Sequence, residues 1–193
     1  VLAENVIEQG DRAGVQIVSP AIPGQKERDD PRTTMGFIGY GVGAAEMMLI
    51  ESGRDHTERG RELRREAEKI IASFLRLPMS PPIGEGFYIK TGEPAMTERG
   101  ANPEIFLRSF CDDMKSLMRA YDRERQEGRP HPEWLAWVRQ FGDWLLKQEE
   151  AGGGFPRSWE PGTGKVRSAS TTGTFNVVPF YAQLYRLTGN KTY

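Results

Sequence analysis

The chain has 193 residues, which is enough for one domain or for part of a larger one. Hydrophobic residues make up 37% and charged residues 27%, with a formal net charge of −1, as in an ordinary globular protein. This balance excludes the basic surface that nucleic acid or an anionic membrane would need. The single cysteine, Cys111, excludes an internal disulfide and a Cys-rich metal site, so we expect no metal and no cofactor. The compartment stays open, and a secreted or periplasmic location is our expectation.

The N-terminal part of the chain contains two segments of interest. Residues 1–9 have the pattern of a helix already under way, which predicts a piece of a longer protein. The least polar run, from Met35 to Ile50, contains Tyr40 and Glu46 and is shorter than the ~20 apolar residues that a membrane span needs. We therefore predict a buried helix there and no membrane partner.

The hydrophobic pattern predicts five helices. Two are amphipathic with a charged face, at residues 57–77 and 132–150, where apolar side chains recur at helical spacing. Pro132 suits a first-turn position, and the glycines from Gly152 onward stop this helix. Three more apolar helices are predicted at about residues 33–52, 103–126 and 174–187. The glycine-rich start of the first has poor helix propensity, so burial must stabilise it.

The connections between these helices alternate in length. A long loop rich in glycine and proline precedes each apolar, inner helix, at residues 10–32, 78–102 and 151–170. A short turn precedes each charged, outer helix position, at residues 53–56, 128–131 and 189–192. This alternation is typical of a helical-hairpin repeat. We predict an all-α fold of antiparallel helical hairpins with short β-hairpins in the long loops, and residues 1–193 as a single unit.

An internal repeat of about 69 residues supports this organisation. Phe37, Phe106 and Phe175 are spaced 69 residues apart, each near the start of an inner helix. In the loops, the segment Gly-Glu-Gly-Phe that ends at Phe87 lies 68 residues before the segment Gly-Gly-Gly-Phe that ends at Phe155. Helices and loops therefore repeat in the same phase.

The segment from Trp144 to Tyr193 contains the most specific pattern. It includes Gly-Gly-Gly-Phe-Pro-Arg-Ser-Trp, which ends at Trp159, and Leu-Thr-Gly-Asn-Lys-Thr-Tyr at the end. This resembles the hairpin repeat of six-hairpin glycosidases and their relatives. In these proteins an outer helix ends in a Gly-Gly-Phe/Trp-Pro loop, and an inner helix closes with a Leu-Tyr-x-x-Thr-Gly-Asp-x-x-Tyr turn. Asn190 stands where the aspartate is usual.

The resemblance implies an (α/α)6-type toroid, of which this chain holds about three hairpins, or half a ring. Half a ring would expose its inner helices, so we expect the missing half of the toroid, or a partner chain, to cover them. The toroid does not fix one activity, because hydrolases, lyases, epimerases and cyclases share it.

The resemblance also implies that the long loops and the first turns of the inner helices line the cleft. Glycoside hydrolysis needs two carboxyl groups there. We single out Glu104 at the start of an inner helix, Glu160 in a loop, Asp30 before an inner helix, and Asp112 of a mid-helix pair with Asp113. Other carboxylates on this side are Asp29, Glu85, Glu93 and Glu98. Helix-dipole, capping, paired or solvated charges are the structural alternatives.

Aromatic and basic side chains are the candidate sugar contacts. Trp159 and Tyr88 in the long loops could stack on the apolar faces of sugar rings. Arg157, Arg108 and Tyr40 could donate hydrogen bonds to hydroxyl groups or to a uronate. The alternative for the loop aromatics, above all for the phenylalanines of the repeat, is that they anchor the loops on the hairpins.

The two histidines, His56 and His131, fall in short turns on the face opposite the cleft. We expect them to be solvated. Their position weakens a histidine-based epimerase, and the lack of Cys and His ligands weakens a zinc-dependent cyclase.

The predicted function is that of a carbohydrate-active enzyme, a glycoside hydrolase that uses a carboxylate pair on an oligo- or polysaccharide. One alternative is a polysaccharide lyase, with Tyr88 or Tyr40 as base and Arg157 neutralising a uronate. The other is a non-catalytic scaffold or sugar-binding toroid.

Overall fold

The structure is a computed structural model that describes residues 5–15, 31–36, 41–95, 97–99, 102–169 and 173–193. In these residues the fold is mostly helical, with five α-helices and several short antiparallel sheets. It is therefore mixed rather than all-α. The strands go beyond the short loop hairpins we predicted, because they pair segments from different long loops and so satisfy the backbone groups of the loops.

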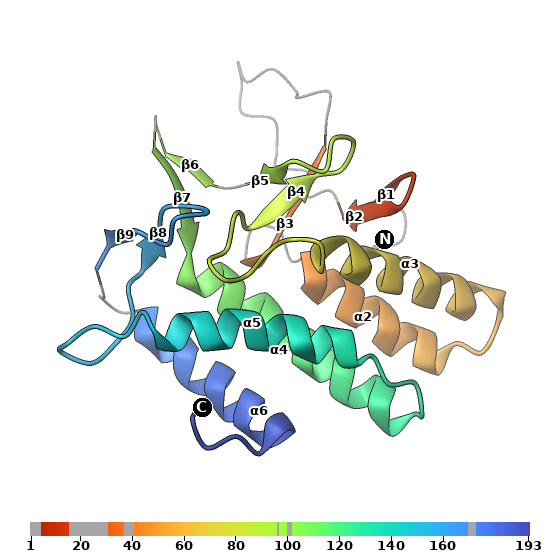
Figure 1. Cartoon of the computed structure of the whole chain (residues 1–193). Helices are drawn as coiled ribbons and strands as arrows, with labels where there is room; N and C mark the ends of the chain where they lie inside the picture. Colours follow the sequence, from red (N-terminus) through yellow and green to blue (C-terminus); the bar gives the residue numbers. More distant parts are fainter. Residues whose placement is uncertain (1–4, 16–30, 37–40, 96, 100–101, 170–172) are drawn as a thin grey trace.

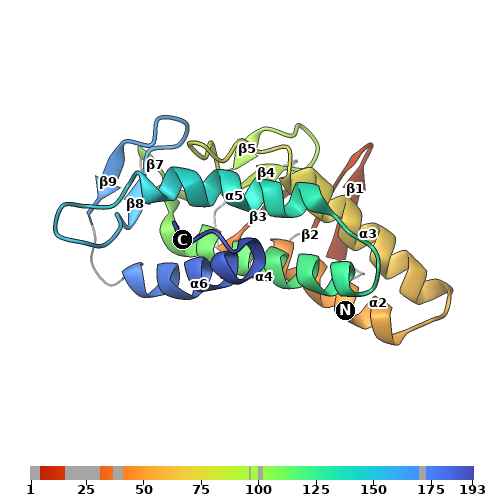
Figure 2. The ribbon, with the colours of Figure 1, turned by 60° about the horizontal axis from the view of Figure 1, so that its bottom comes forward.

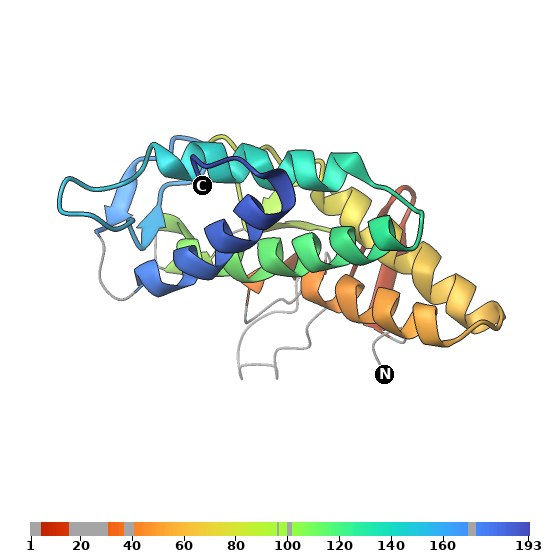
Figure 3. The same ribbon diagram turned by 90° about the horizontal axis from the view of Figure 1, so that it is seen from below.

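Four of the five helices form two of the predicted antiparallel pairs, and the fifth is the inner helix at the C-terminal end of the chain. The inner helices are α2 (Gly41–Arg54), α4 (Leu107–Gln126) and α6 (Val177–Thr188), and the outer helices are α3 (Glu58–Phe74) and α5 (Pro132–Leu146). Helix α4 contacts both α2 and α6, so the inner helices lie side by side (Figure 3). Helix α3 packs on α2 and helix α5 on α4, which gives a second layer (Figure 2).

Short strands gather at the N-terminal ends of the inner helices (Figure 1). A two-stranded sheet pairs β1 (Val6–Gln9) with β2 (Arg12–Val15). A three-stranded sheet has the order β3 (Arg32–Thr34), β4 (Gly86–Tyr88), β5 (Pro94–Ala95). A four-stranded sheet has the order β6 (Thr97–Arg99), β7 (Asn102–Phe106), β8 (Ser158–Trp159), β9 (Val166–Ser168). All described pairings are antiparallel.

Two predicted helical segments are strands instead. We expected residues 1–9 to end a helix, but Val6–Gln9 pairs with Arg12–Val15 in a hairpin whose turn contains Gly10 at φ 59°. We expected an inner helix from residue 103, but Asn102–Phe106 is a strand and α4 begins at Leu107. There Ile105 is buried while Glu104 and Phe106 are only partly covered, which is the alternation of a strand.

Two of the three phenylalanines of the proposed repeat lie in the described residues, each close to the start of an inner helix. Phe106 is the residue immediately before α4, and Phe175 lies in the 3-10 turn η2 (Gly173–Asn176) that leads into α6. Phe37 lies outside the described residues. The phenylalanines of the loop repeat are anchors, since Phe87 packs against Phe74 of α3 and Phe155 against Tyr181 of α6.

The core lies between the two helix layers. Phe110 of α4, Phe141 of α5 and Phe180 of α6 are fully buried, and the ring of Phe141 lies 5.0 Å from that of Phe110 and 5.6 Å from that of Phe180. Burying such a side chain stabilises a fold by ~1.5–3 kcal/mol. Trp137 connects α5 to the segment that follows α3, because its indole N–H donates to the carbonyl of Leu77 at 2.8 Å. In the described part of the chain, no helix is long and apolar enough to cross a membrane.

Candidate active site

The four-stranded sheet leads directly into α4, because β7 and the helix are continuous in sequence. Residues Ile105 and Trp159 are partners across β7 and β8, and both are fully buried. They form the face of this sheet that is turned to the core. Of the residues next to them, Ser158 is also buried, whereas Glu104 and Glu160 are partly exposed.

Two predicted catalytic residues lie on either side of the β7–β8 pairing. The register pairs Ile105 with Trp159 and Phe106 with Ser158. Glu104 precedes Ile105 and pairs with Thr97 of β6, and Glu160 follows Trp159, the last residue of β8. Both glutamates are partly exposed, and each is next in sequence to a member of the buried Ile105–Trp159 pair.

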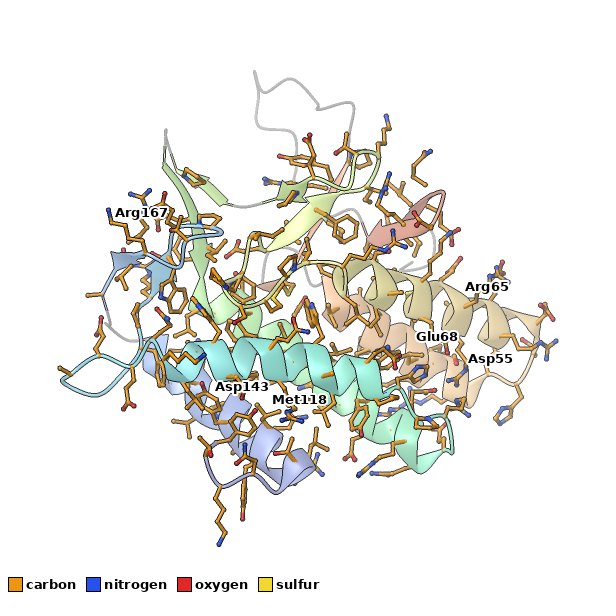
Figure 4. All side chains as sticks on the ribbon, in the orientation of Figure 1. Asp55, Arg65, Glu68, Met118, Asp143 and Arg167 are labelled. Carbon is orange, nitrogen blue, oxygen red and sulfur yellow. The ribbon has the colours of Figure 1, made fainter. Side chains whose placement is uncertain are left out.

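Each of these carboxylates has a polar partner. The hydroxyl of the fully buried Ser158 donates to Oε2 of Glu104 at 2.9 Å. The guanidinium of Arg167, labelled beside β9 in Figure 4, lies 3.3 Å from Oε2 of Glu160. Each glutamate therefore has its own partner, one neutral and one cationic. Glu104 differs from our prediction only in its element, since it lies in β7 and not in a helix turn.

The predicted basic residues lie around the same end of α4. Arg157 is exposed, and its guanidinium carbon lies 5.8 Å from the centre of the Phe106 ring. Arg108, in the first turn of α4, is exposed and lies 3.4 Å from Asp112 one turn later. Both arginines have their charged ends at the surface, where they are able to bind hydroxyl or carboxylate groups.

The Asp112–Asp113 pair divides between two environments. Asp112 is partly exposed and forms ion pairs with Arg108 and Lys115 at 3.4 Å and 3.2 Å. Asp113 is buried against α2, where its Oδ2 accepts the backbone N–H of Val42 at 3.0 Å. Burial raises the pKa of Asp113 to about 7, and hydrogen bonds from the backbone of Val42 and Gly36 oppose this rise only in part.

Helical spacing identifies which aspartate is buried. The buried positions of α4 include Phe110, Met114 and Leu117, and Asp113 falls on this face while Asp112 does not. Asp113 was not among the predicted catalytic residues, although this spacing was visible in the sequence. Its contacts make it a cap for the start of α2.

Glu85 is a second buried carboxylate near the start of α4. Only 3% of its surface is exposed, and its Oε1 accepts the backbone N–H of Phe106 at 2.5 Å. Its backbone carbonyl accepts the N–H of Met35 at 2.7 Å. Glu85 therefore joins β3, β4 and the start of α4. The Gly-Glu-Gly-Phe pattern predicted a loop here, but it did not predict that Glu85 connects these elements.

The two aromatic candidates are placed differently. Trp159 is fully buried, and its ring centre lies 5.1 Å from that of Trp144 in an edge-to-face arrangement. The indole of Trp159 therefore packs in the core of the described structure and has no ring face exposed to a sugar. Tyr88 of β4 is partly exposed, opposite Arg32 of β3. Asp30 and Tyr40, and also Asp29, lie outside the described residues.

The two histidines have different surroundings. His56 is exposed in the turn between α2 and α3, as we expected. His131 is only partly exposed, and its ring stacks on Trp134 with ring centres 4.0 Å apart. The expectation of a solvated His131 was therefore wrong, because the first turn of α5 places Trp134 against it.

Comparison with known proteins identifies the fold. No family model and no curated protein sequence matches the chain. Among solved structures, it is similar to a GH76 α-mannanase of Bacteroides thetaiotaomicron, with a TM-score of 0.54 and 11% sequence identity. The match covers 98% of this chain and 48% of the mannanase, so the chain spans about half the length of that protein. Residues 1–193 therefore have the fold of part of a six-hairpin (α/α) toroid, as the sequence resemblance implied.

Proposed function

We propose that the chain is part of a glycoside hydrolase that cleaves a polysaccharide, and that α-mannan is the first substrate to test. The observation that carries the proposal is that Glu104 and Glu160, both partly exposed, flank the buried Ile105–Trp159 pair of the β6–β9 sheet. Glycoside hydrolysis needs two such carboxyl groups beside the scissile bond. The likeness of the fold to half of an α-mannanase supports the class of reaction and suggests the sugar.

The partners of the two glutamates suggest a division of roles. Arg167 pairs with ionised Glu160, so we assign Glu160 the role that requires negative charge, either attack on the sugar or activation of water. Glu104 has a hydroxyl partner, Ser158, and no cationic partner among the described residues, so we assign Glu104 the role of the acid that protonates the leaving oxygen. Asp112 stays a further candidate, and its ion pairs with Arg108 and Lys115 suit an ionised group.

Sugar binding is proposed for the side chains around this pair. Arg157 and Arg108 carry exposed guanidinium groups that can donate to several hydroxyls. Tyr88 offers a ring and a hydroxyl from the long loop between α3 and α4, and Tyr40, which lies outside the described residues, stays a candidate. Trp159 is not included, because its indole is fully buried.

The rest of the ring, or a partner chain, is proposed to complete the cleft. Large apolar side chains are exposed on α2 and α6: Met47 is 54% exposed, Val178 67% and Tyr185 45%. Val178 and Tyr185 are seven residues apart, so they lie on one side of α6. Exposed apolar surface of this kind marks an interaction site, and the matched mannanase is about twice as long.

A polysaccharide screen on the full-length protein tests this proposal. New reducing ends from α-mannan or another glycan support hydrolysis. An unsaturated product would show a lyase instead, and binding without turnover would show a sugar-binding module. For the active pair, we expect Glu104→Gln and Glu160→Gln each to lower the hydrolysis rate by about 100-fold or more. Glu58→Gln, at an exposed position on α3, is the control that keeps the rate.

A further inference from the structure

A second group of polar side chains lies at the far ends of the helices, away from the candidate active site. Glu68 of α3, Glu124 of α4 and His131 before α5 each offer one atom, and these atoms lie within 4.8 Å of one another. Figure 4 labels Glu68 on α3, beside the turn that joins α4 to α5. Three helices therefore converge on this cluster, which we call the Glu68–Glu124–His131 cluster.

The orientation of the imidazole leaves one ring nitrogen free. Nδ1 of His131 lies 3.3 Å from Oε1 of Glu133, and stacking on Trp134 at an interplanar angle of 7° fixes the plane of the ring. Nε2 is buried and has no hydrogen-bond partner in the described part of the chain. With the proton on Nδ1 and donated to Glu133, Nε2 keeps a bare lone pair that is able to bind a cation. A carboxylate that orients a histidine in this way is typical of metal-binding histidines.

Glu124 supplies a buried and ionised carboxylate. Its side chain has no exposed surface, and Oε2 accepts from Arg64 Nη1 at 2.5 Å and from Arg129 Nε at 2.7 Å. Oε1 accepts only a longer bond from Arg129 Nη2, at 3.3 Å, among the described residues. Oε1 therefore keeps lone-pair capacity for another cation.

The charges around the cluster favour a dication in spite of the two arginines. Four carboxylates lie in or next to the cluster, those of Glu68, Glu124, Glu127 and Glu133, against two guanidinium groups, those of Arg64 and Arg129. The acidic groups therefore outnumber the basic ones. We propose that the Glu68–Glu124–His131 cluster binds a divalent transition-metal ion of the zinc class, which clamps α3, α4 and α5 together.

Ligand type and spacing fit this ion. Zinc binds imidazole nitrogen and carboxylate oxygen at ~2.0–2.2 Å, and three protein ligands with a water as the fourth make a common site. Ligand atoms that already lie within 4.8 Å reach such a geometry by small side-chain rotations. Metals that prefer oxygen ligands alone, such as magnesium and calcium, are less suited to a site with an imidazole.

Zinc titration of the apo-protein, followed by calorimetry and by thermal unfolding, tests the proposal. We expect zinc to bind the wild-type chain with one-to-one stoichiometry and to raise its Tm, since an ion that binds only the folded state stabilises it. His131→Gln should weaken zinc binding by about tenfold or more and abolish the rise in Tm. His56→Gln removes the exposed histidine of the other short turn and should leave both unchanged.

Two further measurements keep the test decisive. Glu68→Gln changes a partly exposed side chain and should also weaken zinc binding, whereas loss of the buried Glu124 would risk unfolding. Far-UV circular dichroism without metal must show the same helix content for every variant. The proposal is overturned if the wild type does not bind zinc, or if His131→Gln binds it as tightly as His56→Gln does.

Discussion

At the scale of single residues, Asp113 should give the fold a measurable pH dependence. Its pKa is raised to about 7 in the folded state from the ordinary value of 3.8, chiefly by burial. Between these values the folded state binds more protons than the unfolded state, so the free energy of unfolding falls as the pH rises from about 4 to about 7. We expect Asp113→Asn, which cannot ionise, to remove most of this slope. Thermal unfolding over this pH range measures it.

The neighbouring residue supplies the control for this prediction. Asp112→Asn removes a partly exposed carboxylate that is paired with Arg108 and Lys115. The slope should persist in this variant. Equal slopes in Asp113→Asn and in the wild type would show that Asp113 is not the group responsible.

Trp159 was predicted to stack on a sugar ring, but its side chain is fully buried. It is fully buried against Trp144, so Trp159→Ala should lower the free energy of unfolding by about 3–5 kcal/mol through the cavity that it leaves. Trp159→Phe should cost less, because it fills much of the space and removes an indole N–H that is buried without a partner among the described residues. Urea unfolding of both variants checks this order. A smaller loss for alanine than for phenylalanine would contradict the packing role.

At the scale of elements, an ion pair joins the inner helices α2 and α4. Arg119 of α4 donates two hydrogen bonds to Glu46 of α2, at 2.7 Å and 2.6 Å, and Glu46 is only 6% exposed. Arg119→Met would leave the buried carboxylate of Glu46 without its cation. Since the arginine itself is half exposed, we expect a loss of about 2 kcal/mol rather than the larger cost of breaking a fully buried pair.

The exposed pair between Arg61 and Glu58 on α3 is the matched control. Arg61→Met should change the free energy of unfolding by less than about 0.5 kcal/mol. Chemical unfolding of the two variants compares them directly. Similar losses at the two positions would mean that burial of Glu46 does not decide the strength of the α2–α4 contact.

The helices were predictable from the sequence, while the strands before them mostly were not. Apolar spacing around Ile70 and Phe141 signalled α3 and α5, and the predicted ranges overlap the observed ones. Glu104, by contrast, was assigned to a helix because its own sequence permits one. The strand that contains it pairs with Thr97–Arg99 in a local hairpin and with Ser158–Trp159 more than 50 positions later, and this second pairing leaves no local pattern. The candidate site was therefore predictable as residue types, but not as the β6–β9 sheet that positions Glu104 and Glu160.

At the scale of the whole molecule, the exposed side of α6 should be a surface for further hairpins or a partner chain. Val178 and Tyr185 are 67% and 45% exposed there. We expect residues 1–193 alone to self-associate, and Val178→Ser combined with Tyr185→Ser to reduce this association. Light scattering after size-exclusion chromatography measures the mass. A monomeric wild-type chain at high concentration would contradict the prediction.

The central claim is that Glu104 and Glu160 act together on a glycosidic bond. The most direct test is the rate of reducing-end release by the full-length protein carrying Glu104→Gln, Glu160→Gln or both, on the glycan that the wild type cleaves best. Because catalytic groups that act as a unit are strongly non-additive, we expect the double variant to be about as slow as the slower single variant. Full activity in both single variants, or losses that simply multiply in the double variant, would contradict the account.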